Sequence, residues 1–278
     1  MSGTLFIVAT PIGNLDDLSP RARETLAGVN LIAAEDTRHT GRLLSHFGVK
    51  TPLIALHDHN EDQAVAGLVD ELSAGKSIAL VSDAGTPLIS DPGYRLVALA
   101  HAKGMRVVPV AGPSAVTAAL SAAGLPTDRF CFEGFLPGKH KARIDQLAAL
   151  NDEVRTLVFY ESVHRVRDSL ADMCEVFGGD RFAFIGRELT KLHEQCLQAP
   201  LADLLRQLDE GDIPCKGEFV IIVAGTTTKP ASTYDVDLLL TELSTVLSSK
   251  DAARIAAKLT PHQRNDLYAR ILELNDRK

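Results

Sequence analysis

The 278-residue chain is 45% hydrophobic and 23% charged, a composition typical of folded globular proteins, which excludes disordered and fibrous classes. No apolar run approaches the roughly 20 residues of a membrane span, and a net charge of −7 argues against general nucleic-acid affinity while allowing a local basic face. Four separated cysteines without a C-x-x-C pair favour free thiols over disulfides or zinc. We therefore expect a cytoplasmic protein of two or three domains that holds no metal.

Strand and helix patterns alternate in a first domain predicted over residues 1–124. Apolar runs predict strands at 5–9, 31–34, 53–56, 78–81 and 107–110. Ser19-Pro20 predicts a helix start, and 60–63 resembles a capping box that opens another helix. Near-continuous apolar strands separated by helices predict a parallel-rich sheet covered on both faces.

A second α/β domain is predicted over residues 125–228. Strands are expected at 130–132, 156–160, 182–186 and 218–224, and helices at 163–177, capped by Ser162, and at 201–208. After a polar linker at 226–233, three helices at 238–247, 251–259 and 261–274 predict an appendage over 234–278, with a helix-turn-helix outline. From Ser249 onward it has seven Lys or Arg against four Asp or Glu, so its net charge is +3.

A long connection between Val81 and Tyr94 is the most informative feature of the chain. It reads V-S-D-A-G-T-P-L-I-S-D-P-G-Y, whereas most connections in compact domains have about 4–6 residues. Gly- and Pro-rich loops at 10–14 and 111–115 also follow predicted strands. Because ligands of parallel α/β sheets bind outside the carboxyl ends of strands, these three loops predict one ligand cleft. None of them has a Walker or G-x-G-x-x-G pattern.

Other polar clusters have two interpretations each. Residues 35–39 could bring Asp36, Arg38 and His39 to the cleft or form an ordinary helix start. The H-x-H at 57–59 is a weak metal pattern because no third ligand is spaced for it. Glu161 and His164 could be functional or belong to a helix start. Residues 187–191 follow a strand that reads as buried, which favours the cleft over a surface salt-bridge run.

These motifs together resemble the ribosomal RNA small subunit methyltransferase I family of the tetrapyrrole methylase superfamily. The resemblance is carried by the twelve-residue loop S-D-A-G-T-P-L-I-S-D-P-G at 82–93, by T-P-I-G-N-L at 10–15, A-E-D-T-R at 34–38, H-D-H-N-E at 57–61, F-Y-E-S at 159–162, R-E-L-T-K at 187–191 and K-G-E at 216–218. It covers essentially the whole chain.

The resemblance implies two α/β domains with S-adenosylmethionine in the cleft between them, a homodimer, and 16S rRNA or the small ribosomal subunit as partner. The implied activity is 2′-O-methylation of a cytidine ribose in the decoding region. The positions that match the family's cofactor contacts are Pro11, Ser82, Asp83, Thr86, Ser114, Ala115, Leu189 and Thr190, together with Glu161. Tetrapyrrole enzymes usually carry Met where this chain has Glu161, which weakens a precorrin-type assignment.

Motif position and chemistry suggest roles for the polar residues. Glu161 or Glu188 could accept the hydroxyl proton, and Lys191 or Arg187 could stabilise a developing alkoxide. Candidates for phosphate contacts are Arg38, Lys139, Lys141 and Arg143. The first half of the long loop is expected to face the cofactor. Its second half, Ser90 to Gly93, is expected to be scaffold, with Asp91-Pro92 starting the next helix.

Two rival functions remain at this stage. One is a tetrapyrrole C-methylase on the same fold, and the other is a non-catalytic RNA-binding protein that uses the basic appendage. The appendage itself could contact RNA, support a dimer, or present a solvated basic face.

Overall fold

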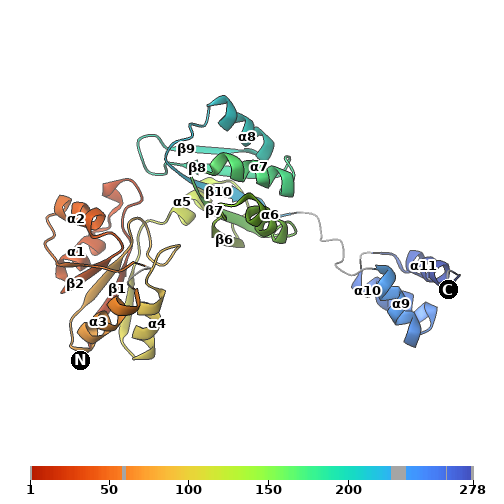
Figure 1. Cartoon of the computed structure of the whole chain (residues 1–278), viewed down its shortest axis with the longest axis horizontal. Coiled ribbons are helices and arrows are strands. Elements are labelled where there is room, and N and C mark those ends of the chain that lie inside the picture. Colours follow the sequence, from red (N-terminus) through yellow and green to blue (C-terminus); the bar gives the residue numbers. More distant parts are fainter. Residues whose placement is uncertain (1, 58–60, 227–235, 261, 277–278) are drawn as a thin grey trace. The chain divides into compact units, whose positions relative to one another are not determined.

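The computed structural model describes residues 2–57, 61–226, 236–260 and 262–276 (Figure 1). Clustering of contacts gives two compact units, Met1–Asn151 with Arg155–Ala224, and Asp152–Val154 with Gly225–Lys278. Residues 58–60 lie outside the described residues, and they include two residues of the H-x-H cluster and the first residue of the expected capping box. Nearly all of the expected linker also lies outside the described residues. The division into three domains stays a prediction.

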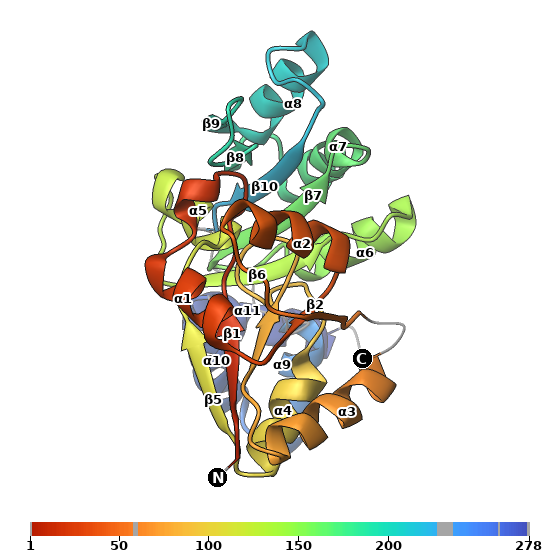
Figure 2. The same ribbon diagram turned by 90° about the vertical axis from the view of Figure 1, so that its left-hand side faces the viewer.

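The first sheet has five parallel strands in the order β3-β2-β4-β1-β5. The strands are β1 Thr4–Val8, β2 Leu31–Ala34, β3 Leu53–Ala55, β4 Ile78–Val81 and β5 Arg106–Val110. A 3-10 turn, Leu15–Asp17, precedes α1 Pro20–Gly28, and the other helices are α2 Thr37–His46, α3 Glu61–Ser73 and α4 Tyr94–Ala102. Buried residues of α1 and α2 pack on one face and those of α3 and α4 on the other (Figure 2). The predicted parallel sheet with two covered faces is confirmed.

The second sheet is mixed and has the order β6-β7-β10-β8-β9, in which only β6 and β7 are parallel. Its strands are β6 Phe130–Phe135, β7 Thr156–Ser162, β8 Phe182–Arg187, β9 Gln195–Pro200 and β10 Glu218–Val223. One face packs against α6 His140–Ala149, α7 Val166–Phe177 and α8 Leu201–Glu210, and the other against α5 Ala115–Ala122. Helix α5 therefore packs on the second sheet although it precedes residue 124.

Three local expectations were wrong. Strand β9 was missed because it is a half-exposed edge strand with a mixed polar sequence, so it lacks the apolar run that revealed the others. Helix α7 begins at Val166 rather than Val163, and Ser162 ends β7 instead of capping the helix. Helix α4 begins at Tyr94, with Gly93 as its N-cap at a φ of 116°, so Asp91-Pro92 does not start it.

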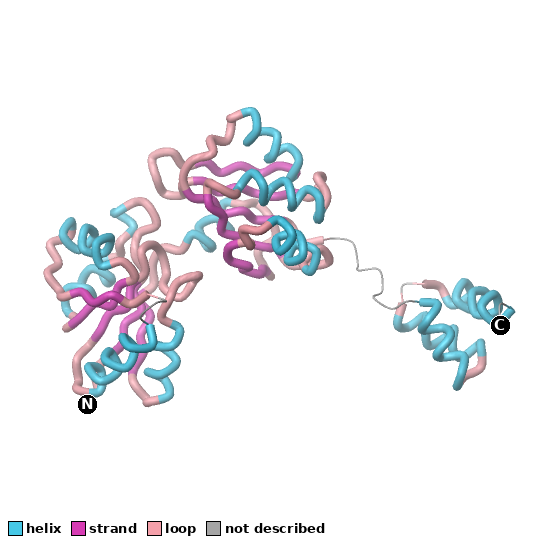
Figure 3. Tube along the Cα trace, in the orientation of Figure 1, coloured by secondary structure: helices cyan, strands magenta, loops and turns pink. Residues whose placement is uncertain are grey.

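The second unit contains α9 Val236–Val246, α10 Ser249–Leu259 and α11 Arg264–Asp276. These helices are drawn in cyan in Figure 3. They enclose a small core of Leu240, Ala252, Ala253, Ala256, Leu267 and Ile271. Ser248 caps α10 through the backbone N–H of Asp251, and Arg270 joins α11 to α9 by its ion pair with Asp237, at 2.8 Å. The three predicted helices are confirmed to within a few residues.

Candidate active site

A cavity of about 610 Å³ lies at the strand ends of the first unit, a size typical of small-molecule sites. The loops after β1, β2, β4 and β5 contribute to its wall, and so do β6, β7 and β10 of the second sheet. The lining residues are Ile12, Glu35, Asp83, Ala84, Gly85, Thr86, Ile89, Ser90, Asp91, Ser114, Ala115, Phe135, Tyr160, Glu161, Ser162, Val163, Gly217, Glu218, Phe219 and Val220.

The three glycine- and proline-rich loops are joined by direct hydrogen bonds. Thr10 and Gly85 exchange backbone hydrogen bonds of 2.9 and 3.1 Å, and the Thr86 hydroxyl donates to the Pro113 carbonyl at 2.9 Å. Gly85 has a φ of 82°, and an added Cβ would lie 3.2 Å from Ile12. The prediction that these loops share one edge of the sheet is confirmed by this contact set.

The long loop holds two non-glycine residues in the left-handed region of backbone space. Leu88 has a φ of 75° and Ser90 a φ of 69°, and Glu188 and Thr190 in the loop after β8 have φ values of 49° and 67°. Such conformations cost about 1–3 kcal/mol each and persist only where the surroundings enforce them. Leu88 and Ser90 flank Ile89, which lines the cavity, so the strain lies in the cavity wall.

Five of the predicted cofactor-contact residues line the cavity, namely Asp83, Thr86, Ser114, Ala115 and Glu161. Ser114 is the N-cap of α5, but its side chain makes no capping hydrogen bond there. Thr190 lies beside a second hollow of about 420 Å³, and its buried hydroxyl has no partner within the described residues. Pro11, Ser82 and Leu189 are not part of the described cavity wall.

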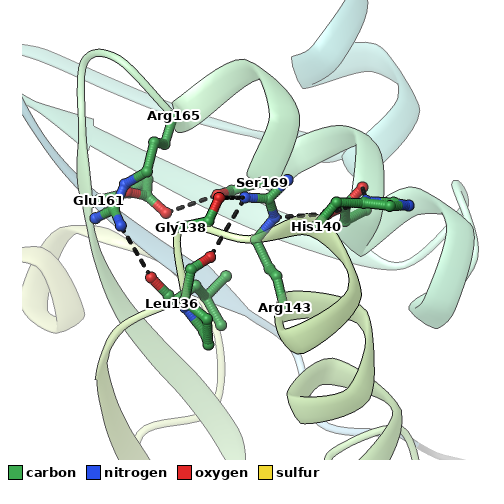
Figure 4. Close-up of polar contacts among 9 residues, drawn as sticks. Leu136, Gly138, His140, Arg143, Glu161, Arg165 and Ser169 are labelled. Atoms are coloured by element: carbon green, nitrogen blue, oxygen red, sulfur yellow. Dashed lines mark hydrogen bonds and ion pairs between the residues drawn. The ribbon is translucent and has the colours of Figure 1, made fainter.

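The Glu161 carboxylate, on β7, is held by residues at the start of α7 (Figure 4). Its side chain is 0% exposed, although the residue belongs to the cavity wall. One oxygen accepts from the Ser162 backbone at 2.7 Å and pairs with Arg165 at 3.1 Å, and the other accepts from the Ser169 hydroxyl at 2.6 Å. With both oxygens occupied, Glu161 is a positioning residue in this geometry, which does not support its predicted role as base.

Arg165 connects this carboxylate to the neighbouring strand. Its guanidinium also donates to the carbonyl of Leu136 at 3.2 Å, directly after Phe135 at the end of β6 (Figure 4). The pair Glu161–Arg165 therefore fixes the end of β6 against the end of β7. Phe135 is 52% exposed and makes an edge contact with the Tyr160 ring, with centroids 5.5 Å apart.

The other three predicted catalytic residues form a network outside the cavity wall. Arg187 is buried and donates to the carbonyls of Lys216 and His193, so it joins loops and does not face a ligand. Lys191 bonds Glu188 and Glu218, both at 2.8 Å. Burial alone would raise the pKa of Glu188 and lower the pKa of Lys191. The bonds between these side chains outweigh burial, so the pKa of Glu188 is lowered and the pKa of Lys191 is raised. A carboxylate held ionised in this way is a weak proton acceptor.

Sequence reasoning assigned no site role to four titratable residues of the cavity wall, Glu35, Asp91, Tyr160 and Glu218. Burial raises the pKa of Asp91 to about 6, and the nearby charge of Asp83 adds to the effect. Burial and then the charge of Asp91 raise the pKa of Tyr160 to about 12. Asp91 was assigned to scaffold because an Asp-Pro pair after a glycine-rich stretch is typical of a helix start. The position of the carboxylate depends on the strained turn before it, which the sequence did not reveal.

The predicted phosphate contacts differ in their surroundings. Lys139 and Lys141 are exposed at the start of α6. Arg143, labelled in Figure 4, is 3% exposed and pairs with Asp172 at 2.5 Å, so the structure gives no support to its predicted phosphate contact, which stays a prediction. Arg38 is exposed but pairs with Asp36, the N-cap of α2, which agrees with the helix-start interpretation of that segment.

Neither a metal centre nor a membrane-spanning helix is present among the described residues. No group of three His, Cys, Asp or Glu is placed to hold a metal ion there, and no helix among these residues is long and apolar enough to cross a membrane.

Two known protein families match this chain. Residues 4–205 match the family described as Tetrapyrrole (Corrin/Porphyrin) Methylases, and residues 230–275 match the RsmI C-terminal HTH domain. The crystal structure of uroporphyrin-III-C-methyltransferase from Thermus thermophilus shares this fold, with a TM-score of 0.57, 17% identity, and coverage of 80% of this chain and 94% of that one.

Similar proteins with known names indicate a particular family within the class of tetrapyrrole methylases. A protein of Xylella fastidiosa (strain Temecula1) is 52% identical over 96% of this chain and 98% of its own, and one of Pseudomonas aeruginosa is 51% identical over 98% of each. Both are called Ribosomal RNA small subunit methyltransferase I. The chain belongs to this family of S-adenosylmethionine-dependent methyltransferases.

The cavity wall fits S-adenosylmethionine. Its acidic residues are Glu35, Asp83, Asp91, Glu161 and Glu218, and no Lys or Arg of the described residues belongs to it. The Glu161 carboxylate is held by Arg165 and Ser169, and Glu218 pairs with Lys191, so Glu35, Asp83 and Asp91 remain to give the wall its negative charge. An acidic wall suits a sulfonium cation. The first backbone N–H groups of α5, which the Ser114 side chain leaves uncapped, suit the carboxylate of an amino acid. Asp83, Thr86, Ser114 and Ala115 are the residues that would hold the cofactor.

Proposed function

We propose that this enzyme methylates the 2′-oxygen of a cytidine ribose in the decoding region of 16S rRNA. The observation that carries the proposal is identity of about half of all residues, over nearly the full length, to proteins called Ribosomal RNA small subunit methyltransferase I. The choice of a cytidine 2′-oxygen rests on the resemblance of the loop motifs. S-adenosylmethionine supplies an activated methyl group, so the protein has to position the acceptor and remove its proton.

The cavity offers a place for a nucleoside. Phe135 and Ile89 are partly exposed apolar side chains in its wall, and a half-exposed aromatic ring is suited to stacking on a base that has left its helix. Tyr160 contacts the Phe135 ring edge-on, and burial raises the pKa of Tyr160 to about 12. These features support an RNA nucleotide as the acceptor.

Exposed cations near this aromatic ring are suited to phosphates. Lys139 and Lys141 follow Phe135 in sequence at the start of α6, and both are exposed. Phosphate contacts position a nucleic acid without reading its sequence. We expect Lys139 and Lys141, together with Arg38, to contribute to RNA affinity, and a homodimer with a cytoplasmic location remains part of the proposal.

The test is an incubation of purified protein with labelled S-adenosylmethionine and unmethylated small-subunit RNA, free or in assembled 30S particles. Incorporation into a ribose at one cytidine is expected. Binding of RNA without incorporation would support the non-catalytic alternative, and methylation of a porphyrinoid in place of RNA would support a tetrapyrrole methylase.

A further inference from the structure

Asp91 lies in the wall of the cavity in a setting unlike that of the other carboxylates. It is half-buried, and the Ser82 hydroxyl hydrogen-bonds to its carboxylate. The two left-handed residues Leu88 and Ser90 precede it, and Gly93, also left-handed, follows it. An added Cβ on Gly93 would lie 2.7 Å from Leu80, so the turn after Asp91 is fixed against the core of the first sheet.

The remaining carboxylates of the wall also have interaction partners. Glu161 pairs with Arg165 and Glu218 with Lys191. Asp83 accepts the backbone N–H of Asp36 at 3.0 Å. Glu35 also has an interaction partner. The groups that act on Asp91 are the Ser82 hydroxyl and the charge of Asp83, with no lysine or arginine of the described residues among them.

The titratable groups that share the cavity wall with Asp91 come from both sheets. Glu35 and Asp83 follow β2 and β4, Tyr160 and Glu161 lie on β7, and Glu218 begins β10. Burial raises the pKa of the Asp91 carboxyl to about 6, and Asp83 adds to this while the Ser82 hydroxyl opposes it. Such a carboxyl is ionised at neutral pH and is a stronger base than an ordinary aspartate, as proton transfer from a substrate requires.

We propose that Asp91 is the general base that takes the proton of the ribose 2′-hydroxyl, a role that rests on the proposed function. The 2′-oxygen forms its new bond to the methyl carbon while the S–CH₃ bond breaks and leaves its electron pair on sulfur. The hydroxyl proton moves to a carboxylate oxygen of Asp91 and is later released to water. The ribose ether, neutral S-adenosylhomocysteine and one proton are the products, so atoms and charge balance.

The test compares full-length wild type with Asp91→Asn on the small-subunit substrate in single-turnover experiments between pH 5 and 9. Wild type is expected to lose rate below about pH 6, whereas Asp91→Asn should be slower by 10²–10⁴-fold and lack that limb. S-adenosylhomocysteine and RNA affinities should change by less than about twofold, which separates catalysis from binding. Asp209→Asn, an exposed carboxylate on α8, is the matched control and should react like wild type.

The outcomes separate this role from the proposed function. Ribose methylation by Asp91→Asn within threefold of the wild-type rate would overturn the role of Asp91 and leave the proposed function standing. Transfer to a base atom by wild type would overturn both. If Asp91→Asn does not fold, the wild-type profile decides, because a rate that is flat between pH 5 and 7 with unchanged binding contradicts the proposal.

Discussion

Glu161 and Asp91 both belong to the cavity wall, but their carboxylates have different chemical environments and therefore different roles. Both carboxylate oxygens of Glu161 accept hydrogen bonds, from Arg165, the Ser169 hydroxyl and the Ser162 backbone N–H, whereas Asp91 has one hydroxyl partner and a neighbouring carboxylate. The first arrangement stabilises the fold at the ends of β6 and β7. The second arrangement raises the pKa of Asp91 toward neutral pH, which is typical of catalytic groups.

Glu161→Ala is expected to lower the free energy of unfolding by about 3 kcal/mol, because it leaves the partly buried Arg165 without its ion pair. Urea denaturation at neutral pH measures this loss. Asp209→Ala, which breaks the exposed pair with Arg167, is the control and should have no resolvable effect. Equal loss in both variants would show that the Glu161 network is not a structural anchor.

Asp91→Asn is expected to stabilise the protein above pH 6. Because the folded state raises the pKa of Asp91 from its ordinary value of 3.8 to about 6, the folded state binds more protons than the unfolded state between these values. The wild type therefore loses stability as pH rises through that range, and the variant does not.

We expect a gain of about 1 kcal/mol at pH 7.5, a figure reduced for the solvent exposure of a half-buried group, and no gain near pH 3.5. Thermal unfolding at the two pH values measures it. A variant that is less stable than wild type at pH 7.5 would contradict the burial of an ionised Asp91.

At the scale of elements, the site depends on how closely the loop after β1 meets the loop after β8. A Cβ on Gly13 would lie 2.3 Å from the Cγ atom of Lys191 and 3.1 Å from the Leu189 carbonyl oxygen. A Cβ on Gly217 would likewise lie 2.3 Å from a carboxylate oxygen of Glu188. These glycines allow the backbone contacts that bring Thr190 beside Ser114.

Gly13→Ala should weaken S-adenosylhomocysteine binding about tenfold, since the two loops must separate by a few tenths of an ångström or more. Isothermal titration calorimetry measures the affinity. Gly67→Ala, at an exposed position in α3 with no atom within 4 Å of the new Cβ, is the matched control and should bind normally with a stability gain of about 0.5–1 kcal/mol. Unchanged affinity in Gly13→Ala would argue against a cofactor role for this contact.

The elements themselves could largely be predicted from apolar periodicity. Strands such as β4, which is buried throughout, and capped helices such as α1 give strong local signals. Strand β9 gives none because it lies half-exposed at a sheet edge. The role of Arg143 could not be predicted either, because its burial depends on Asp172, which lies 29 residues away on another helix.

The whole molecule comprises two units with separate cores. All described residues of the cavity wall lie between Ile12 and Val220, within the first unit, while the C-terminal helices have their own core around Leu240 and Ala256. The folding of the first unit and its cofactor site should therefore be independent of the helical unit.

A chain ending at Thr226 should bind S-adenosylhomocysteine within about twofold of the full-length affinity. Calorimetry on both proteins measures this, and a large loss of affinity would show that the helical unit contributes to the cofactor site. Methylation of assembled 30S particles by the shortened chain then decides the role of the basic helices. An unchanged rate would rule out an essential substrate contact, and a lower rate would favour an RNA contact.

The measurement that bears most directly on the central claim is the chemical identity of the methylated nucleoside. Small-subunit RNA methylated by the full-length protein with labelled S-adenosylmethionine is digested to nucleosides and separated by mass-detected chromatography. We predict label in 2′-O-methylcytidine at a single site, with alkali-resistant linkage at that position because the ribose hydroxyl is blocked. Label in a base-methylated nucleoside, or RNA bound without any label transferred, would contradict it.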